Sequence, residues 1–600
     1  MHVGEQRHAR SRWRSRLRRY WRDTRWAVIA GLWVFAVCLG VIAFKNYQDY
    51  HPDKYSYSFW SWLYLSLQLF PLQSGLVEEP VGTDLQIARL LAPGVAAFTL
   101  LEAVLAIFSE QLRWLRVRFM KGHIVISGLG REGFLLASML VGRGDQVVAI
   151  EQDRARSAVD EAREMGVTVL LGSATDRELL RKAGAQRARY VVTVSGDDGI
   201  NAEVAAHVQE LAEYDRRSAL TSVVEISNLE LSYLLRAQAL MTEKPVGFKR
   251  DFFNLFENGA QALLADFPPF PLMDAGQGSR PHVLVVGLGR LGESLIMLVA
   301  KAWWLRPAAN GERLSVTVVD PEAEGKIEAL RLRYRHLEQA CNLVVRSTDI
   351  RSADFQRAEF LIASDGRPAV SSIYICLDDD STGLAAALVL LPHARVLDVS
   401  LVVCMTHEAG LATLLPAIGK QVDGFKHLCT FEFLNRACTP DSMLGGANEV
   451  LARAMHASYV QNEAEKGETP ETNTSMVAWE ALPDDLKDSN RDQAAHVSLK
   501  LRAVNCTLAP LTDWDAVRFE FRPDELEVLA QMEHKRWVEE RRAAGWRWAP
   551  GPRDTPRKTT PYLVPWDELA EDVKEKDRNA VRGLPVFLAR AGLKICRRNE

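Results

Sequence analysis

The sequence predicts a multidomain protein with an α-helical membrane module, two α/β domains and an α-helical tail. Three observations lead to this fold class: two apolar runs near the N-terminus, two glycine-rich strand–turn–helix segments, and an internal repeat near the C-terminus. The chain of 600 residues is long enough for several domains, and its apolar fraction of 48% can fill several cores. We expect a basic N-terminal tail (1–25), a membrane module (26–118), a first α/β domain (119–265), a second α/β domain (280–440) and a repeat tail (441–600).

The overall composition argues against several classes of partner. The formal net charge of -4 is small for this length, so no overall field attracts nucleic acid. The eight cysteines form no Cys-x-x-Cys pair and have no histidine at ligand spacing. We therefore expect neither a metal site nor a disulfide framework.

The first apolar run, Trp26 to Phe44, contains no charged residue. Its length of about 19 residues, at about 1.5 Å per residue, is just enough to cross a hydrocarbon layer of about 30 Å. Nine arginines lie between Arg7 and Arg25, and they should hold the N-terminus in the cytoplasm. The alternative role for these arginines is binding of nucleic acid or anionic lipid headgroups.

A second apolar run, Ile87 to Phe108, is followed by a basic segment that ends at Lys121. In the connection between the two runs, Lys45 to Leu85, acidic residues outnumber basic ones. We therefore expect this connection to lie outside the cell. The sequence thus predicts a multi-pass protein of the plasma (inner) membrane whose two termini are both cytoplasmic.

Within the outer connection, Phe59 to Leu72 is apolar but too short to span a bilayer, which indicates a re-entrant helix. This order of helix, re-entrant helix, turn and helix resembles the pore module of two-helix potassium channels. The Thr-Val-Gly-Tyr-Gly filter of that family is absent, so the resemblance does not extend to potassium selectivity. The segment that stands in its place, and that we predict to line the pore, consists of Phe70, Pro71, Leu72, Gln73, Ser74 and Gly75.

Two features of the second apolar run bear on gating. Pro93-Gly94 is either a gating hinge or a static kink. Glu102 is a carboxylate at membrane depth, which we expect to face the pore. The alternative partner, Arg89, is more than three helical turns away on the same helix.

The first α/β domain begins with an apolar strand that opens on the turn Gly128-Leu-Gly130-Arg-Glu-Gly133. A second strand ends in Glu151, where the ribose hydroxyls of a dinucleotide would lie. The glycines permit a tight turn and close approach of a pyrophosphate to a helix N-terminus. The alternative is that they only pack a helix against a strand.

The second α/β domain repeats this layout. Its turn contains Gly287, Gly289 and Gly292, and its later strand ends in Asp320. We therefore predict two Rossmann-type units that bind NAD(H) or another adenine nucleotide.

The segment from Val169 to Asp198 carries a more specific resemblance. The pattern Gly172-Ser-Ala-Thr175-Asp176, the pairs Leu179-Leu180 and Ala183-Gly184, and Asp197-Asp198 resemble the regulator-of-potassium-conductance (RCK, or TrkA N-terminal) domain. The resemblance covers about residues 119–240 and, more loosely, 280–420. It implies a ring gated by a nucleotide, although the family usually has aspartate at the position of Ser173.

The tail contains two copies of one helical unit. Trp479 to Arg491 aligns without a gap on Trp566 to Arg578, and a matching helix start precedes each copy. The second copy has the order of motifs seen in ryanodine-receptor (RyR) repeats, and 445–595 resembles that family. We expect Gln461 to Ser475 to be an inserted loop of the first copy.

Several residues of the tail are candidates for either a purine-stacking pocket or helix packing, and packing is favoured because buried tryptophan is ordinarily core. These residues are His456, Trp479, Arg491, His534, Trp537, Trp546, Trp566 and Arg578.

Together these features predict a ligand-gated cation channel, or channel-like effector, that assembles as a homotetramer and is gated by nucleotide binding. The alternative is a non-conducting membrane-anchored nucleotide sensor or scaffold, with a stress or antiviral role as a guess from domain association. An enzyme is not expected, because neither Rossmann unit is joined to a substrate domain with an acid–base set.

Overall fold

The computed structural model describes residues 2–50, 57–73, 81–214, 220–242, 247–270, 281–305, 312–334, 336–362, 370–406, 427–465, 467–511, 514, 518–552, 554 and 556–598. The N-terminal module consists of helices α1 (His2–Tyr50), α2 (Phe59–Gln68), α3 (Thr83–Ile107) and α4 (Ser109–Arg118). Two stretches, Thr24–Asp49 and Thr83–Val104, are long and apolar enough to cross a membrane. Helix α1 runs without a break from His2, so the residues predicted as a basic tail (1–25) are helical and continuous with the first apolar stretch.

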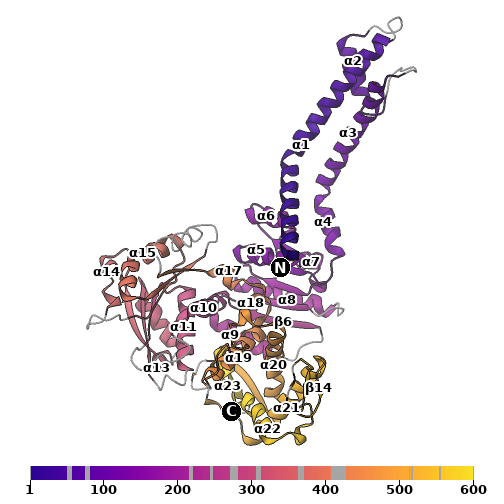
Figure 1. The fold of residues 1–600 in the computed structure, drawn as a ribbon. Coiled ribbons are helices and arrows are strands. Elements are labelled where there is room, and N and C mark those ends of the chain that lie inside the picture. Colours follow the sequence, from indigo (N-terminus) through magenta and orange to yellow (C-terminus); the bar gives the residue numbers. More distant parts are fainter. Residues whose placement is uncertain are drawn as a thin grey trace. The chain divides into compact units, whose positions relative to one another are not determined.

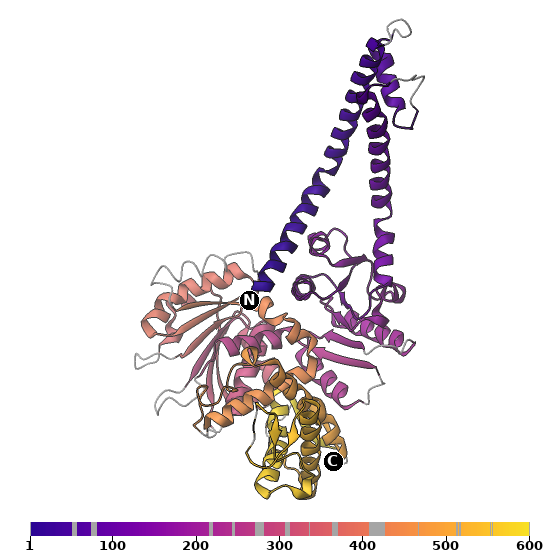
Figure 2. The same cartoon turned by 45° about the vertical axis from the view of Figure 1, so that its right-hand side comes forward.

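The short helix α2 lies where the re-entrant helix was predicted, beside α1 and α3 (Figures 1 and 2). A Cβ atom added to Gly40 of α1 would lie 2.9 Å from the side chain of Ser66, so these two helices approach closely. The ring of Phe70 stacks on Trp33, with the ring centroids 4.1 Å apart. Phe70 therefore packs in the core of this module.

The other predicted pore residues differ from Phe70. Pro71, Leu72 and Gln73 are exposed, and Leu72 has a left-handed backbone (φ 66°). Ser74 and Gly75 lie outside the described residues. Helix α3 continues through Pro93, so the proposed hinge is not a helix break.

Glu102 has a basic partner on helix α1. The Oε2 atom of Glu102 lies 3.6 Å from Nη1 of Arg25 on α1. Neither of the two expected alternatives, a pore-facing Glu102 or a pair with Arg89, included this contact. Arg25 can reach Glu102 because it lies on the neighbouring helix, whereas Arg89 is more than three turns away on the same helix.

The first Rossmann unit contains a six-stranded sheet in the order β3-β2-β1-β4-β5-β6. Strand pairs such as Ile124↔Val147 and Ile124↔Tyr190 are parallel, and the core strands are apolar and buried as parallel sheets require. Its strands are β1 (Ile124–Ser127), β2 (Val147–Glu151), β3 (Thr168–Leu171), β4 (Tyr190–Thr193), β5 (Leu220–Glu225) and β6 (Phe248–Phe253). Its helices are α5 (Arg131–Arg143), α6 (Ser157–Met165), α7 (Arg177–Lys182), α8 (Asp198–Tyr214), α9 (Leu229–Met241) and α10 (Leu255–Asp266).

The second Rossmann unit has the same topology, with the strand order β12-β11-β10-β7-β8-β9. Its strands are β7 (His282–Val286), β8 (Leu314–Asp320), β9 (Cys341–Ser347), β10 (Ser372–Ile375), β11 (Ser400–Met405) and β12 (Leu428–Glu432). Its helices are α11 (Arg290–Trp304), α12 (Ala323–Arg333), α13 (Leu337–Ala340), α14 (Ala353–Arg357) and α15 (Asp380–Leu397), and α17 (Phe433–Ala437) and α18 (Pro440–Leu444) follow β12. The predicted duplication of the α/β domain is therefore confirmed.

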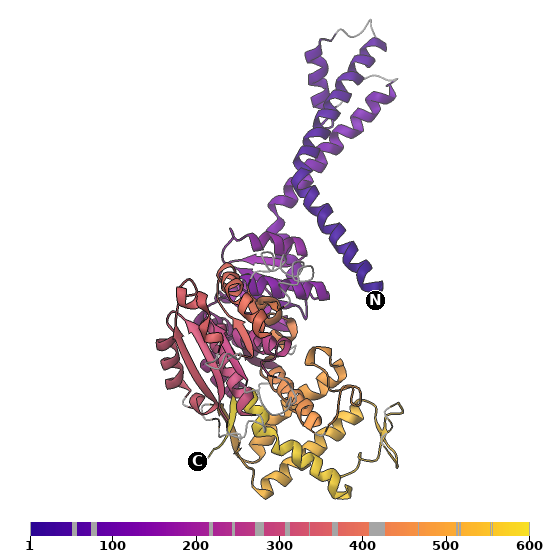
Figure 3. The ribbon, with the colours of Figure 1, turned by 60° about the vertical axis from the view of Figure 1, so that its left-hand side comes forward.

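The tail contains the two predicted helical units (Figure 3). The first has α19 (Gly446–Glu465), α20 (Asp484–Ala503) and β13 (Cys506–Pro510), and the second has α21 (Pro523–Ala543), α22 (Glu571–Arg582), α23 (Leu584–Arg590) and β16 (Leu593–Arg597). Strands β13 and β16 pair antiparallel. The loop expected at 461–475 is present over 467–475, whereas Gln461–Glu465 extends α19. It is not an insertion relative to the second copy, whose connection is longer and contains β14 (Arg547–Trp548) and β15 (Thr559–Thr560).

The tail shares its core with the first Rossmann unit. Ala237 and Leu240 of α9 belong to the same buried cluster as Leu451, Trp479 and Leu529 of the tail. At the start of α19, the backbone N–H of Ala447 donates to Oδ1 of Asp251 on β6 at 2.7 Å. Gly446 has φ 58°, and an added Cβ would overlap the Asp251 carboxylate, so only glycine fits this junction.

Candidate functional site

The fold itself requires the two outer glycines of the first glycine turn. An added Cβ would lie 2.7 Å from the Val194 carbonyl oxygen at Gly128, and 2.0 Å from the Gly128 carbonyl oxygen at Gly133. The outer two glycines are thus required by packing of strand and helix. Gly130 is the N-cap of α5 and provides no side-chain cap, which leaves backbone N–H groups of the first turn available to an anion.

The second glycine turn has the same geometry. An added Cβ at Gly287 would lie 2.6 Å from the Cys376 carbonyl oxygen, and one at Gly292 would lie 2.1 Å from the Gly287 carbonyl oxygen. At Gly289 the nearest atom is Oδ1 of Asp378 at 3.5 Å, an ordinary contact. The packing interpretation therefore explains the outer glycines of both turns, whereas no close contact requires a glycine at the middle position of the second turn.

Each of the two predicted ribose acceptors forms a hydrogen bond with the backbone of its own glycine turn. Oε2 of Glu151 accepts the backbone N–H of Leu129, and Oδ2 of Asp320 accepts that of Leu288, each at 2.8 Å. Each carboxylate thus lies beside the turn that would bind the pyrophosphate.

The second acceptor, Asp320, also contacts a lysine. Nζ of Lys326 lies 2.8 Å from Oδ1 of Asp320. Burial raises the pKa of Asp320, but the hydrogen bonds from Lys326, Leu288 and Glu322 outweigh it and lower the pKa overall. A ribose hydroxyl would have to compete with Lys326 here.

The predicted tail residues form two equivalent clusters. In the first, Glu449 accepts from Trp479 Nε1 (3.0 Å) and Arg491 Nε (2.7 Å), and His456 lies against the Trp479 ring. In the second cluster, Glu527 accepts from Trp566 Nε1 (3.0 Å) and Arg578 Nε (2.9 Å), and His534 lies against the Trp566 ring.

The polar atoms of both clusters are used within the protein, which fits the packing interpretation. His456 bonds the Val477 carbonyl and His534 the Val564 carbonyl, each at 2.8 Å. Sequence reasoning missed Glu449 and Glu527, although each precedes its histidine at the same spacing.

The remaining two tryptophans share one set of neighbours. Trp537 stacks beside His534, with ring centroids 6.1 Å apart. Trp546 is buried with Val538 and Leu563, Trp537 packs against this group, and Arg541 lies over both tryptophan rings. Trp546 is thus a core residue of the second copy.

Asp577 distinguishes the two copies electrostatically. Its Oδ2 lies 3.4 Å from Nδ1 of His534, whereas the first copy has Asn490 at this position. Burial lowers the pKa of His534, but Asp577 and the Val564 carbonyl outweigh it and raise the pKa overall.

Comparison with known proteins supports the assignments of these domains. Residues 124–241 match the TrkA-N domain, and residues 521–597 match the RyR domain, which corresponds to the second tail copy. The chain thus carries a TrkA-N (RCK) domain, a second Rossmann-like unit of the same topology, and a RyR domain.

Curated relatives resemble only a short part of this chain. It is 30% identical over 88 residues to the glutathione-regulated potassium-efflux system protein KefC of Klebsiella pneumoniae, covering 15% of this chain and 14% of the relative. It is 37% identical over 79 residues to the Trk system potassium uptake protein TrkA homolog of Archaeoglobus fulgidus, covering 13% and 17%. Each match therefore spans less than a fifth of the relative.

Solved structures with similar arrangements include two of GsuK. The GsuK channel bound to NAD has 13% sequence identity and a TM-score of 0.37, covering 82% of this chain and 87% of that chain. GsuK bound to ADP has 16% identity and a TM-score of 0.36, covering 68% and 94%.

Proposed function

We propose that this chain, with its TrkA-N domain, second Rossmann unit and RyR domain, is the subunit of a membrane channel or channel-like effector gated by an adenine nucleotide. The observation that carries the proposal is the first glycine turn. It places an uncapped helix N-terminus beside Glu151, which is the arrangement that binds the pyrophosphate and ribose of a dinucleotide.

The binding step follows from these groups. The backbone N–H groups and the dipole of α5 attract the phosphates, and the Glu151 carboxylate accepts hydrogen bonds from ribose hydroxyls. NAD(H) or another adenine nucleotide is the proposed ligand. In this function the Rossmann units act as sensors rather than as a dehydrogenase.

The covalent chain offers a direct route from the nucleotide site to the membrane helices. Only residues 119–123 separate α4 from β1, and β1 leads into the Gly128 turn. A displacement of β1 on ligand binding would therefore act on α4 and α3. We propose a closed homotetramer in the plasma membrane, with both termini cytoplasmic and an inorganic cation as the conducted species.

A second candidate function is a non-conducting membrane-anchored sensor or scaffold. It is favoured by the segment after α2, where Pro71 has no backbone N–H and Leu72 has a left-handed conformation. Such a segment does not provide the stacked carbonyl rings of a potassium filter.

We expect Gly130→Val to abolish adenine-nucleotide binding at the first unit, because the new side chain would occupy the path of the pyrophosphate. Glu151→Gln should weaken binding about tenfold, the equivalent of about 1.4 kcal/mol. Glutamine is preferable to alanine because its amide oxygen still accepts the Leu129 N–H. Titration calorimetry with NAD, NADH and ADP on the full-length protein would measure these affinities.

The matched control is Gly142→Ala on the same helix, where an added Cβ meets no atom within 4 Å. It should bind nucleotide as the wild type does. Equal affinity of the wild type and Gly130→Val would refute the assignment.

Ion conduction should show no strong preference for potassium, since the segment around Pro71 lacks the filter sequence. The measurement is the reversal potential of the reconstituted protein under asymmetric potassium and sodium, with and without nucleotide. Strict potassium selectivity would contradict the expectation. Absence of current with every nucleotide, despite calorimetric binding, would favour the scaffold function.

A further inference from the structure

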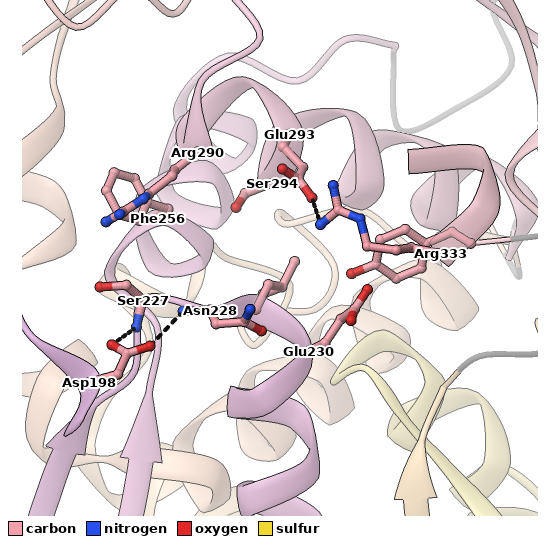
Figure 4. Close-up of a pocket in the computed structure, with 11 residues that line it drawn as sticks. Asp198, Ser227, Asn228, Glu230, Phe256, Arg290, Glu293, Ser294 and Arg333 are labelled. Atoms are coloured by element: carbon pink, nitrogen blue, oxygen red, sulfur yellow. Dashed lines mark hydrogen bonds and ion pairs between the residues drawn. The ribbon is translucent and has the colours of Figure 1, made fainter. Parts of the chain in front are cut away.

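A cavity of about 260 Å³ lies between the two Rossmann units (Figure 4). It adjoins the second glycine turn, which contains Arg290, and is lined by no residue of the first glycine turn. From the first unit it is lined by the start of α8, the turn between β5 and α9, and Phe256 of α10. The second unit contributes one face of α11 and the end of α12. A ligand here would touch both units at once.

Part of the charge around the cavity is already committed to protein partners. The two carboxylate oxygens of Asp198 accept the backbone N–H groups of Ser227 (2.8 Å) and Asn228 (3.2 Å). Nη1 of Arg333 lies 2.9 Å from Oε1 of Glu293. These groups hold the walls in place.

Two charged side chains lack such partners. Within the part of the chain that the structure describes, the side chains of Arg290 and Glu230 form no hydrogen bond or ion pair, and Figure 4 shows them on opposite sides of the cavity. The Arg290 guanidinium lies over the Phe256 ring at 5.5 Å, which holds it near the cavity wall. Both side chains are exposed. The cavity therefore has a solvent-accessible cation at one side and a solvent-accessible carboxylate at the other.

Tyr334 points to a ligand independently of these charges. It lines the cavity and is only 5% exposed, yet its hydroxyl has no hydrogen-bond partner among the described residues. Burial raises the pKa of Tyr334, so the group is a neutral phenol that can both donate and accept. A buried hydroxyl without a partner is destabilising, and a polar ligand that bonded it would remove this penalty.

The balance of charge selects the class of ligand. The lining carboxylates Asp198, Glu230 and Glu293 outnumber the guanidinium groups of Arg290 and Arg333 by one. A nucleotide or another polyanion would therefore be repelled overall, and a simple cation would leave Arg290 without a partner. A molecule with one group of each sign satisfies both free side chains.

We propose that this cavity binds a small zwitterion of the α-amino acid or dipeptide class, with its carboxylate on Arg290 and its ammonium group on Glu230. The Tyr334 hydroxyl supplies a further hydrogen bond. This site is additional to the proposed nucleotide site at the Gly128 turn of the first unit and does not depend on it. Because α9 begins at the cavity and packs on the tail through Ala237 and Leu240, the ligand would lie on the helix that joins the Rossmann pair to the RyR domain.

The test is a thermal-shift screen of the full-length protein against free L-α-amino acids and short dipeptides, followed by calorimetry on those that raise the melting temperature. Each compound is compared with its analogue lacking the ammonium group and its analogue lacking the carboxylate. We expect binding of the zwitterion and loss of about tenfold or more in affinity for either analogue. Arg290→Gln and Glu230→Gln should produce losses of the same size.

Matched controls are Arg395→Gln and Glu328→Gln, which change exposed side chains away from the cavity and should leave the affinity unchanged. Tyr334→Phe is a variant that should still fold, because it removes only the unpartnered hydroxyl. It should keep or raise the melting temperature without ligand while weakening binding.

Two results would overturn the proposal: no binding by any amino acid or dipeptide, or equal binding by the analogues without an ammonium group. Adenine-nucleotide affinity should not change in Glu230→Gln, which lies outside both glycine turns, so the two sites are tested separately.

Discussion

Replacing Glu257 by glutamine should destabilise the protein by about 3–5 kcal/mol, the usual cost of removing one partner of a buried ion pair. Oε2 of Glu257 lies 2.6 Å from Nη1 of Arg236, and the two side chains are 0% and 1% exposed. The Tyr233 hydroxyl donates to Oε1 at 2.9 Å. Glutamine keeps the shape of the residue but leaves the Arg236 charge uncompensated.

A second buried cation makes the expected loss larger. Burial lowers the pKa of Lys301 to about 8, although Glu257 opposes this shift by favouring the charged amine. Without the Glu257 carboxylate, Lys301 would lose that support as well. Glu257 therefore compensates cations from both Rossmann units.

The measurement is the apparent melting temperature of the full-length protein. Glu178→Gln is the control, because the Arg181–Glu178 pair is 60% and 61% exposed and such pairs contribute at most about 1 kcal/mol. The double variant Arg236→Met with Glu257→Leu should recover much of the loss. If the single Glu257→Gln variant has the same melting temperature as the wild type, the Arg236–Glu257 pair does not stabilise the protein.

Trp479→Ala should cost about 3–5 kcal/mol, as expected for a large aromatic side chain removed from a core. Trp479 is 7% exposed and packs with residues of both tail copies and of α9. The same change at Trp566, which is less buried, should cost less. Trp548→Ala is the control, because Trp548 is 56% exposed and should leave stability nearly unchanged.

Melting of the full-length variants, read together with nucleotide binding, separates the two interpretations of the tail clusters. Packing predicts a lowered melting temperature with nucleotide affinity retained. A variant that melts normally but loses its response to a purine would instead indicate a binding pocket at Trp479.

Much of the fold could be predicted from sequence because its signals are local. The two glycine turns, each after an apolar strand and before an amphipathic helix, specify a strand–turn–helix unit without help from distant residues. The tail repeat was visible because Trp479 to Arg491 and Trp566 to Arg578 align without a gap. Both predictions concern residues close together along the chain.

Features that depend on distant residues were missed. The cavity between the Rossmann units combines Asp198, Glu230, Arg290 and Tyr334, whose proximity follows only from the docking of two domains. Arg25 and Glu102 meet because two helices of one hairpin lie side by side. Glu449 and Glu527 carried a signal in their equal spacing from histidine, but glutamate is so common on helices that spacing alone did not identify them.

The core that the tail shares with α9 has a consequence for how this protein can be divided. Cutting the chain after residue 440 would expose Ala237 and Leu240 to water and leave Asp251 without its N–H donor from α19. Freshly exposed apolar surface of this kind promotes self-association. The Rossmann pair and the tail with its RyR domain therefore fold as one unit. Substitutions on α9 must remain compatible with the tail residues that pack against it.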